Sequence, residues 1–166
     1  VKVLDLGCGS GCLLLATLSE LPDAYGLGVD CAALAVAQSR ANAASLSLAR
    51  RADFHIGSWA EGVQGQFDII LSNPPYICEG DASLSTEVRC YDPDLALFAG
   101  QDGLSAYRTL LPQLGAILAK AGQVFLEVGF GQSKAVAQIA EEAGLGLVDI
   151  AKDLAGVERC LVLAKK

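Results

Sequence analysis

Four consecutive residues combine a side-chain amide, two prolines and an aromatic ring: Asn73, Pro74, Pro75 and Tyr76. They follow an apolar run of strand length, Phe67–Ser72, so we expect them to leave a buried strand as a stiff loop, called the NPPY loop below. Proline has no N–H and a fixed φ, and a residue before proline is biased toward extended geometry. The Asn73 side-chain oxygen and the Pro74 carbonyl oxygen can then point outward together, beside the ring of Tyr76.

Two acceptors beside an aromatic face suit a planar –NH2 group. The acceptors take both N–H donors, the ring stacks on one face of the group, and the nitrogen lone pair stays free to react. The alternative is an ordinary strand that two prolines terminate with an Asn turn. The four residues leave both interpretations open, so the surrounding elements must decide.

The hydrophobic pattern along the chain alternates between strands and helices. Short apolar runs predict strands at 1–6, 25–30, 52–57, 67–72, 123–129, 145–151 and 159–164. Longer segments predict helices at 11–21, 32–48, 103–120 and 132–143, with Gly122 and Gly144 ending the last two. Such alternation is typical of a mostly parallel α/β sheet covered by helices on both faces, and the polar stretch 152–158 adds a terminal hairpin. Segment 77–101 is too long for a simple connection, so we expect it to serve function.

A glycine-rich turn joins the first predicted strand to the first helix: Asp5, Leu6, Gly7, Cys8, Gly9, Ser10 and Gly11. Glycines permit a tight turn and close approach of a ligand, and the free N–H groups of a helix start attract an anion. Asp30 ends the second strand about twenty residues later, where a carboxylate can accept both hydroxyls of a ribose. Ligands of open α/β sheets bind beyond the carboxyl ends of the strands. We therefore expect the glycine turn and Asp30 to bind the same ligand.

The glycine spacing separates two classes of cofactor. A nicotinamide or flavin fingerprint would carry Gly or Ala at position 12, where this chain has Cys12. The observed G-x-G-x-G favours a nucleoside that carries a carboxylate, as S-adenosylmethionine does; a generic glycine turn is the alternative. Ser58 and Trp59 follow the third strand, where the indole could pack along adenine and the hydroxyl could cap its edge. A tryptophan at the rim of the core is the other interpretation.

Charge and composition narrow the classes further. The net charge is −7 and 52% of the 166 residues are hydrophobic, which predicts one domain with a real core and argues against a broad phosphate-binding surface. No run approaches the roughly 20 apolar residues of a membrane span, and no secretory signal is visible. The six cysteines form no C-x-x-C pair and there is one histidine, so we expect no metal site. We expect buried free thiols at Cys8, Cys12 and Cys31, in a reducing cytoplasm.

Together, the glycine turn, Asp30 and the NPPY loop resemble class I S-adenosylmethionine-dependent amino-methyltransferases, some of which methylate adenine or guanine amines. Residues 88–104, V-R-C-Y-D-P-D-L-A-L-F-A-G-Q-D-G-L, are similar to the V-R-x-[FY]-[ED]-P-x-x-A-L-x-[AG]-G-x-D-G-L stretch of the PrmC/HemK family. That family comprises the release factor glutamine N5-methyltransferases. Two further segments fit it, Leu126-Glu127-Val128-Gly129 and Arg159-x-x-x-Leu163.

The resemblance implies a Rossmann-like sheet of seven strands in the order 3-2-1-4-5-7-6, with the last strand antiparallel. It implies methyl transfer from S-adenosylmethionine, leaving S-adenosylhomocysteine, to the glutamine of the Gly-Gly-Gln loop in peptide chain release factors. The implied substrate-binding residues are Asn73, Pro74, Pro75 and Tyr76, of which Asn73, Pro74 and Tyr76 are catalytic. The implied cofactor-binding residues are Asp5, Gly7, Gly9, Gly11, Asp30, Ser58, Trp59 and Asn73.

Two departures from the family pattern stand out. Ser58 replaces an Asp that contacts the adenine amine in family members. The family's N-terminal helical domain and Pro-Arg-rich linker have no counterpart here, and the chain has no methionine and opens directly on a strand pattern. We therefore expect residues 1–166 to be the methyltransferase domain of a longer protein.

The expected chemistry follows from the acceptor pair. An amide nitrogen is a poor nucleophile because its lone pair is delocalised into the carbonyl. Acceptors on both N–H groups raise its electron density and stabilise the positive charge that develops in the transition state. Proton loss can follow methyl transfer, so no strong general base is required.

Two other functions share parts of the pattern. A nucleobase N-methyltransferase would bring basic residues to segment 77–101, which instead carries one arginine, Arg89, against five acids: Glu79, Asp81, Glu87, Asp92 and Asp94. We therefore expect contact with nucleic acid only indirectly, through the ribosome. A non-catalytic S-adenosylmethionine-binding partner protein is the third interpretation, but such proteins tend to lose the acceptor loop, which is intact here.

Overall fold

The computed structural model describes residues 1–77 and 102–166. Its strands are β1 (Lys2–Leu6), β2 (Tyr25–Asp30), β3 (Ala52–Ile56), β4 (Phe67–Ser72), β5 (Leu118–Glu127), β6 (Leu145–Lys152) and β7 (Glu158–Lys165). Its helices are α1 (Cys12–Glu20), α2 (Ala33–Ser45), α5 (Ser105–Ile117) and α6 (Ser133–Glu142). Each strand and helix predicted from the periodicity is present.

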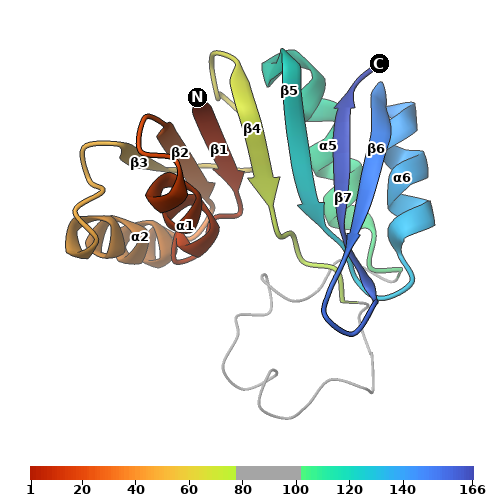
Figure 1. Ribbon diagram of the computed structural model, residues 1–166, viewed down its shortest axis with the longest axis horizontal. Helices are drawn as coiled ribbons and strands as arrows, with labels where there is room; N and C mark the ends of the chain where they lie inside the picture. Colours follow the sequence, from red (N-terminus) through yellow and green to blue (C-terminus); the bar gives the residue numbers. More distant parts are fainter. Residues whose placement is uncertain (78–101) are drawn as a thin grey trace.

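The strands form one seven-stranded sheet in the order β3-β2-β1-β4-β5-β7-β6 (Figure 1). β1 to β5 pair in parallel, whereas β7 runs antiparallel to both β5 and β6. The predicted strand order and the predicted antiparallel strand are therefore confirmed. The carboxyl ends of β1, β4 and β5 meet at one edge of the sheet, which is where their following loops gather (Figure 1).

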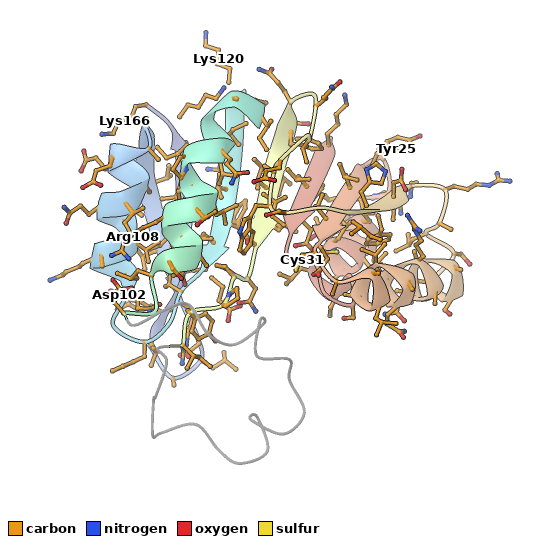
Figure 2. All side chains as sticks on the ribbon, turned by 180° about the vertical axis from the view of Figure 1, so that it is seen from behind. Tyr25, Cys31, Asp102, Arg108, Lys120 and Lys166 are labelled. Atoms are coloured by element: carbon orange, nitrogen blue, oxygen red, sulfur yellow. The ribbon has the colours of Figure 1, made fainter. Side chains whose placement is uncertain are left out.

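Helices cover both faces of the sheet, as predicted. α1 and α2 lie over one face beside β1–β3, and α5 and α6 lie over the opposite face beside β4–β7 (Figures 1 and 2). Neighbouring residues of β1 serve the two sides: Val3 belongs to the apolar cluster with Leu14 of α1, and Leu4 to the cluster with Leu110 of α5. Because strand side chains alternate between faces, β1 joins two cores.

The largest error in the predicted boundaries falls between α5 and β5. The helix expected to reach residue 120 ends at Ile117, and β5 begins at Leu118 instead of residue 123. Leu118 is fully buried and pairs with Phe67 of β4, so a long-range contact overrides the local helix propensity. Gly122 is then a strand residue where the β4 backbone approaches closely: an added Cβ would lie 2.8 Å from the Phe67 carbonyl oxygen. Gly144 does follow α6 with the expected left-handed φ of 82°.

The predicted burial of the thiols is correct for Cys8 and wrong for Cys12 and Cys31, which are exposed (Figure 2 labels Cys31). Leu14, Leu15 and Leu18 form the buried side of α1, which leaves Cys12 on its outer side. Within residues 1–77 and 102–166, no helix is long and apolar enough to cross a membrane, and no cluster of three His, Cys, Asp or Glu side chains could hold a metal ion.

Candidate active site

The glycine turn after β1 has the left-handed backbone that its composition predicts. Gly7, Gly9 and Gly11 have φ values of 74°, 54° and 78°, which residues other than glycine adopt only with strain. A Cβ added at Gly9 would meet no atom within 4 Å, whereas one at Gly11 would lie 3.1 Å from the Phe54 ring. Gly9 therefore borders open space that a ligand can occupy, and Gly11 allows the turn to pack on the core.

The Asp30 carboxylate at the end of β2 joins this turn to the next helix. Its Oδ2 accepts a hydrogen bond from the Gly9 N–H at 2.8 Å, and its Oδ1 accepts one from the Ala32 N–H at 2.9 Å. Each carboxylate oxygen has a second lone pair. The carboxylate is thus held beside the turn with acceptor capacity left, and the ribose contact stays a prediction.

Asp5 is almost fully buried, with 1% of its surface exposed. Its Oδ2 accepts a hydrogen bond from the Leu14 N–H at 3.2 Å, while its Oδ1 has no partner among the described residues. Burial, opposed by the Leu14 hydrogen bond and reinforced by the charge of Asp30, raises the pKa of Asp5 to about 7. A buried oxygen without a partner beside a ligand turn suits a cationic group, so Asp5 fits the amino-acid part of S-adenosylmethionine.

The raised pKa of Asp5 predicts a pH-dependent stability. The pKa is about 7 in the folded chain and roughly 3.9 in the unfolded chain, so protonation favours folding between these values. This contribution is complete below about pH 4 and is lost as the pH rises through 7. The Asn side chain of Asp5→Asn resembles the protonated carboxyl. At pH 8 the free energy of unfolding of this variant should be roughly 1–3 kcal/mol higher than that of the parent, and at pH 4 the two should be similar.

Urea unfolding of the cofactor-free chain at pH 4, 6 and 8 measures this difference. Asp23→Asn changes an exposed carboxylate and serves as the control, with no such pH-dependent gain. Equal unfolding free energies of Asp5→Asn and the parent at pH 8 would contradict the assigned pKa.

Trp59 lies beside the glycine turn, and the contact of Trp59 and Ser58 with adenine stays a prediction. Trp59 is half-buried against the core on the α5 side, and its ring would lie 3.5 Å from a Cβ at Gly7. Its φ of 50° is unusual for a residue with a bulky side chain, and such strain concentrates at functional sites. Trp59 is thus a rim-of-core residue that also borders the turn, and its packing along adenine stays a prediction. Ser58 is exposed.

The NPPY loop starts directly beside the glycine turn. Leu6 at the end of β1 pairs with Ser72 at the end of β4, and the Ser72 hydroxyl donates to the Leu6 carbonyl at 2.7 Å. Gly7 and Asn73 each follow one of these paired residues. The pairing brings the predicted cofactor residues and the predicted acceptor residues to one place at the sheet edge.

Within the loop, Asn73 is exposed, Pro74 is buried, and Pro75 and Tyr76 are half-buried. The Tyr76 hydroxyl lies 3.4 Å from Oε1 of Glu127 at the end of β5. Burial first, and then the charge of Glu127, raises the pKa of the Tyr76 hydroxyl, so it stays a neutral donor. The exposed Asn73 amide can therefore reach a substrate while the rest of the loop is anchored.

Two functional candidates escaped the sequence analysis, Gln132 and Tyr107. The Gln132 side chain donates to the Tyr76 carbonyl at 3.0 Å, and the Tyr107 hydroxyl donates to the Glu127 carbonyl at 3.0 Å. Gln132 directly precedes α6. From the sequence, a polar residue at a helix start is interpreted as a helix cap, so its hydrogen bond to Tyr76 was not predicted. Residues 78–101, including most of the family-like stretch 88–104 and all five acids counted above, lie outside the described residues.

Comparison with known families gives the class of the domain. Residues 1–89 match the family described as MTS, methyltransferase small domain. The chain belongs to the methyltransferase small domain family. This membership confirms the predicted methyltransferase class.

Curated relatives of this methyltransferase domain carry a more specific name. A release factor glutamine methyltransferase of Rhodospirillum rubrum is 50% identical over 166 residues, which cover 99% of this chain and 51% of that protein. One of Caulobacter vibrioides is 44% identical, with coverage of 99% and 57%. One of Cereibacter sphaeroides is 43% identical, with coverage of 95% and 57%. The resemblance to release factor glutamine methyltransferases is confirmed, and the chain spans about half the length of these relatives.

Solved structures confirm the fold. The ribosomal protein L11 methylase of Lactobacillus delbrueckii subsp. bulgaricus aligns with a TM-score of 0.73 at 22% identity, covering 99% of this chain and 70% of that one. The O-methyltransferase NcsB1, solved in complex with S-adenosylmethionine, aligns with a TM-score of 0.71 at 16% identity, covering 99% and 49%. The predicted class I methyltransferase sheet is therefore confirmed, and the predicted cofactor is the one such a domain uses.

Proposed function

We propose that this domain transfers a methyl group from S-adenosylmethionine to the side-chain amide nitrogen of the glutamine in the Gly-Gly-Gln loop of peptide chain release factors. One observation carries the proposal: the pairing of Leu6 with Ser72 places the start of the NPPY loop beside the glycine turn. The 50% identity to a release factor glutamine methyltransferase supports this substrate. We place this activity in the cytoplasm, where the translation machinery works.

Two groups of residues have separate roles in this proposal: one binds the cofactor and the other, the NPPY loop, binds the substrate amide. S-adenosylmethionine, when bound, supplies an electrophilic methyl group on a sulfonium. Gly9 borders the space for it, Asp30 offers acceptors for its ribose, and the unpartnered oxygen of Asp5 offers an acceptor for its ammonium. Trp59, which borders the turn at Gly7, packs along the base in this proposal, and Ser58 caps its edge.

The NPPY loop orients and activates the amide. The Asn73 side-chain oxygen and the Pro74 carbonyl accept the two N–H donors of the substrate, which directs the nitrogen lone pair away from the loop. The same acceptors stabilise the positive charge that develops on nitrogen, most of all in the transition state. Tyr76 packs beside the amide plane, and its hydroxyl contact with Glu127 keeps the ring in place. The proton leaves after transfer, so none of these residues needs to act as a strong base.

Labelled S-adenosylmethionine tests the substrate directly. The chain is incubated with a bacterial release factor, with the same factor carrying Ala for the Gln of Gly-Gly-Gln, and with total RNA. We expect label on the unaltered factor alone. Label on RNA would support the nucleobase alternative, and label on neither, with cofactor binding intact, would support the non-catalytic partner.

A further inference from the structure

The side-chain amide of Gln132 makes three hydrogen bonds around the NPPY loop and a further contact with Tyr107. Its Oε1 accepts from the Gly129 N–H at 3.0 Å and lies 3.5 Å from the Tyr107 hydroxyl, whose single proton goes to the nearer Glu127 carbonyl at 3.0 Å. Its Nε2 donates to the carbonyl oxygens of Tyr76 at 3.0 Å and Gly103 at 3.4 Å. Both donors of the primary amide and one of its acceptor lone pairs are therefore used.

The packing at Gly129 and the backbone bonds of Gln132 both restrict this amide. Gly129 lies so close that an added Cβ would be 2.7 Å from the Gln132 Oε1 and 3.0 Å from Cδ2 of Tyr76. The Gln132 backbone is also held, because its N–H donates to the Gly129 carbonyl at 3.1 Å and its carbonyl accepts from the Val136 N–H of α6 at 3.0 Å. The amide is thus fixed by the end of β5 and the start of α6.

Gln132 bonds the end of the loop that leads away from β4. At the other end, Ser72 is paired with β1 and bonded to Leu6. Pro74 and Pro75 have no N–H groups, so neither can donate a backbone hydrogen bond to a neighbouring element. Tyr76 and Gly103 also flank segment 78–101 on its two sides, so the same –NH2 group ties the residues before and after it.

We propose that Gln132 is a positioning residue for the methyl acceptor. It acts through the Tyr76 carbonyl to set where the Asn73 and Pro74 oxygens point, and it touches neither cofactor nor substrate. This inference rests on the proposed function of the NPPY loop and adds a residue from a different element to it.

Two substitutions of Gln132 test the proposal in the full 166-residue chain. Gln132→Leu removes the three hydrogen bonds of the amide and its contact with the Tyr107 hydroxyl. We expect kcat to fall about 100-fold while KM and cofactor affinity change less than about 3-fold, because misplacing a reacting group by about 1 Å has such an effect. Gln132→Glu keeps the acceptor for Gly129 but turns a carboxylate toward two carbonyl oxygens at neutral pH. Its kcat relative to the parent should rise as the pH falls and the protonated carboxyl donates to Tyr76.

The matched control is Gln138→Leu, which removes an exposed glutamine of α6 whose side chain, among the described residues, bonds to Glu142 alone. It should leave kcat, KM and cofactor affinity unchanged. A Gln132→Leu variant with parental kcat, or a Gln132→Glu variant whose relative kcat is the same at pH 6 and pH 8, would overturn the proposal. Thermal unfolding of each variant separates a loss of fold from a loss of positioning.

An NMR readout keeps this test apart from the proposed function. The side-chain –NH2 resonances of Asn73 should shift in Gln132→Leu and stay in place in Gln138→Leu, whatever the substrate. If the parent methylates no release factor, the proposed function fails while these resonances still show whether Gln132 positions the loop. Unmoved Asn73 resonances in Gln132→Leu would count against the inference even if the parent is active.

Discussion

Asn73→Ala is expected to lower kcat for release factor methylation about 100- to 1,000-fold, the effect of removing a hydrogen-bond partner that acts mainly in the transition state. Affinity for S-adenosylmethionine should change little. Asn73 is exposed, and its side chain makes no hydrogen bond to another described residue, so truncation removes no hydrogen bond within the described part of the chain. The loss would fall on the step in which positive charge develops on the amide nitrogen.

Single-turnover rates and calorimetric cofactor titration measure the two effects separately. Asn73→Asp keeps an acceptor oxygen at nearly the same position and should retain more turnover than Asn73→Ala. An alanine variant with the kcat of the parent would remove Asn73 from the mechanism. If the alanine variant binds the cofactor much more weakly, the main role of Asn73 is the cofactor contact that the family resemblance also implies.

Asp30→Ala is expected to weaken S-adenosylmethionine binding roughly 10- to 100-fold, as expected for loss of hydrogen bonds to a charged group. The structure adds a second effect, because the N–H groups of Gly9 and Ala32 lose their acceptor. Unfolding free energy should therefore fall by about 1–3 kcal/mol. KM for the release factor should change less than affinity for the cofactor.

Asp30→Asn separates the two roles, since its side-chain oxygen can still accept from one of the N–H groups while the charge is lost. It should regain part of the stability and little of the cofactor affinity. The control is Asp23→Ala, an exposed acid in the turn before β2. Calorimetry that finds unchanged affinity in Asp30→Ala would contradict the ribose contact.

Much of the sheet was predictable because its central strands, β1 above all, are largely buried and therefore apolar, whereas β3 and β6 at the two edges are mostly exposed. The bounds of β2 and β4 agree with the predicted ones, since Asp30 ends β2 and an Asn-Pro-Pro run follows β4. The helix end near residue 120 was not predictable from local pattern, because Leu118 is drawn into β5 by pairing with Phe67 of β4. The exposure of Cys12 also depends on tertiary packing, which buries the opposite side of α1.

The sequence by itself determined the chemistry of the site: a glycine turn, a carboxylate that ends β2, and an amide-and-proline loop. These follow from local rules, because positive φ needs glycine and a proline loop after a strand stays stiff. Only the tertiary structure showed that the Asp30 oxygens already accept from two N–H groups and that one Asp5 oxygen is buried without a partner in the described part of the chain. It alone showed that Gln132 holds Tyr76, 56 residues earlier. Contacts between residues so far apart in the sequence arise when α6 packs on the sheet and its start comes to lie beside the NPPY loop. No local pattern encodes them.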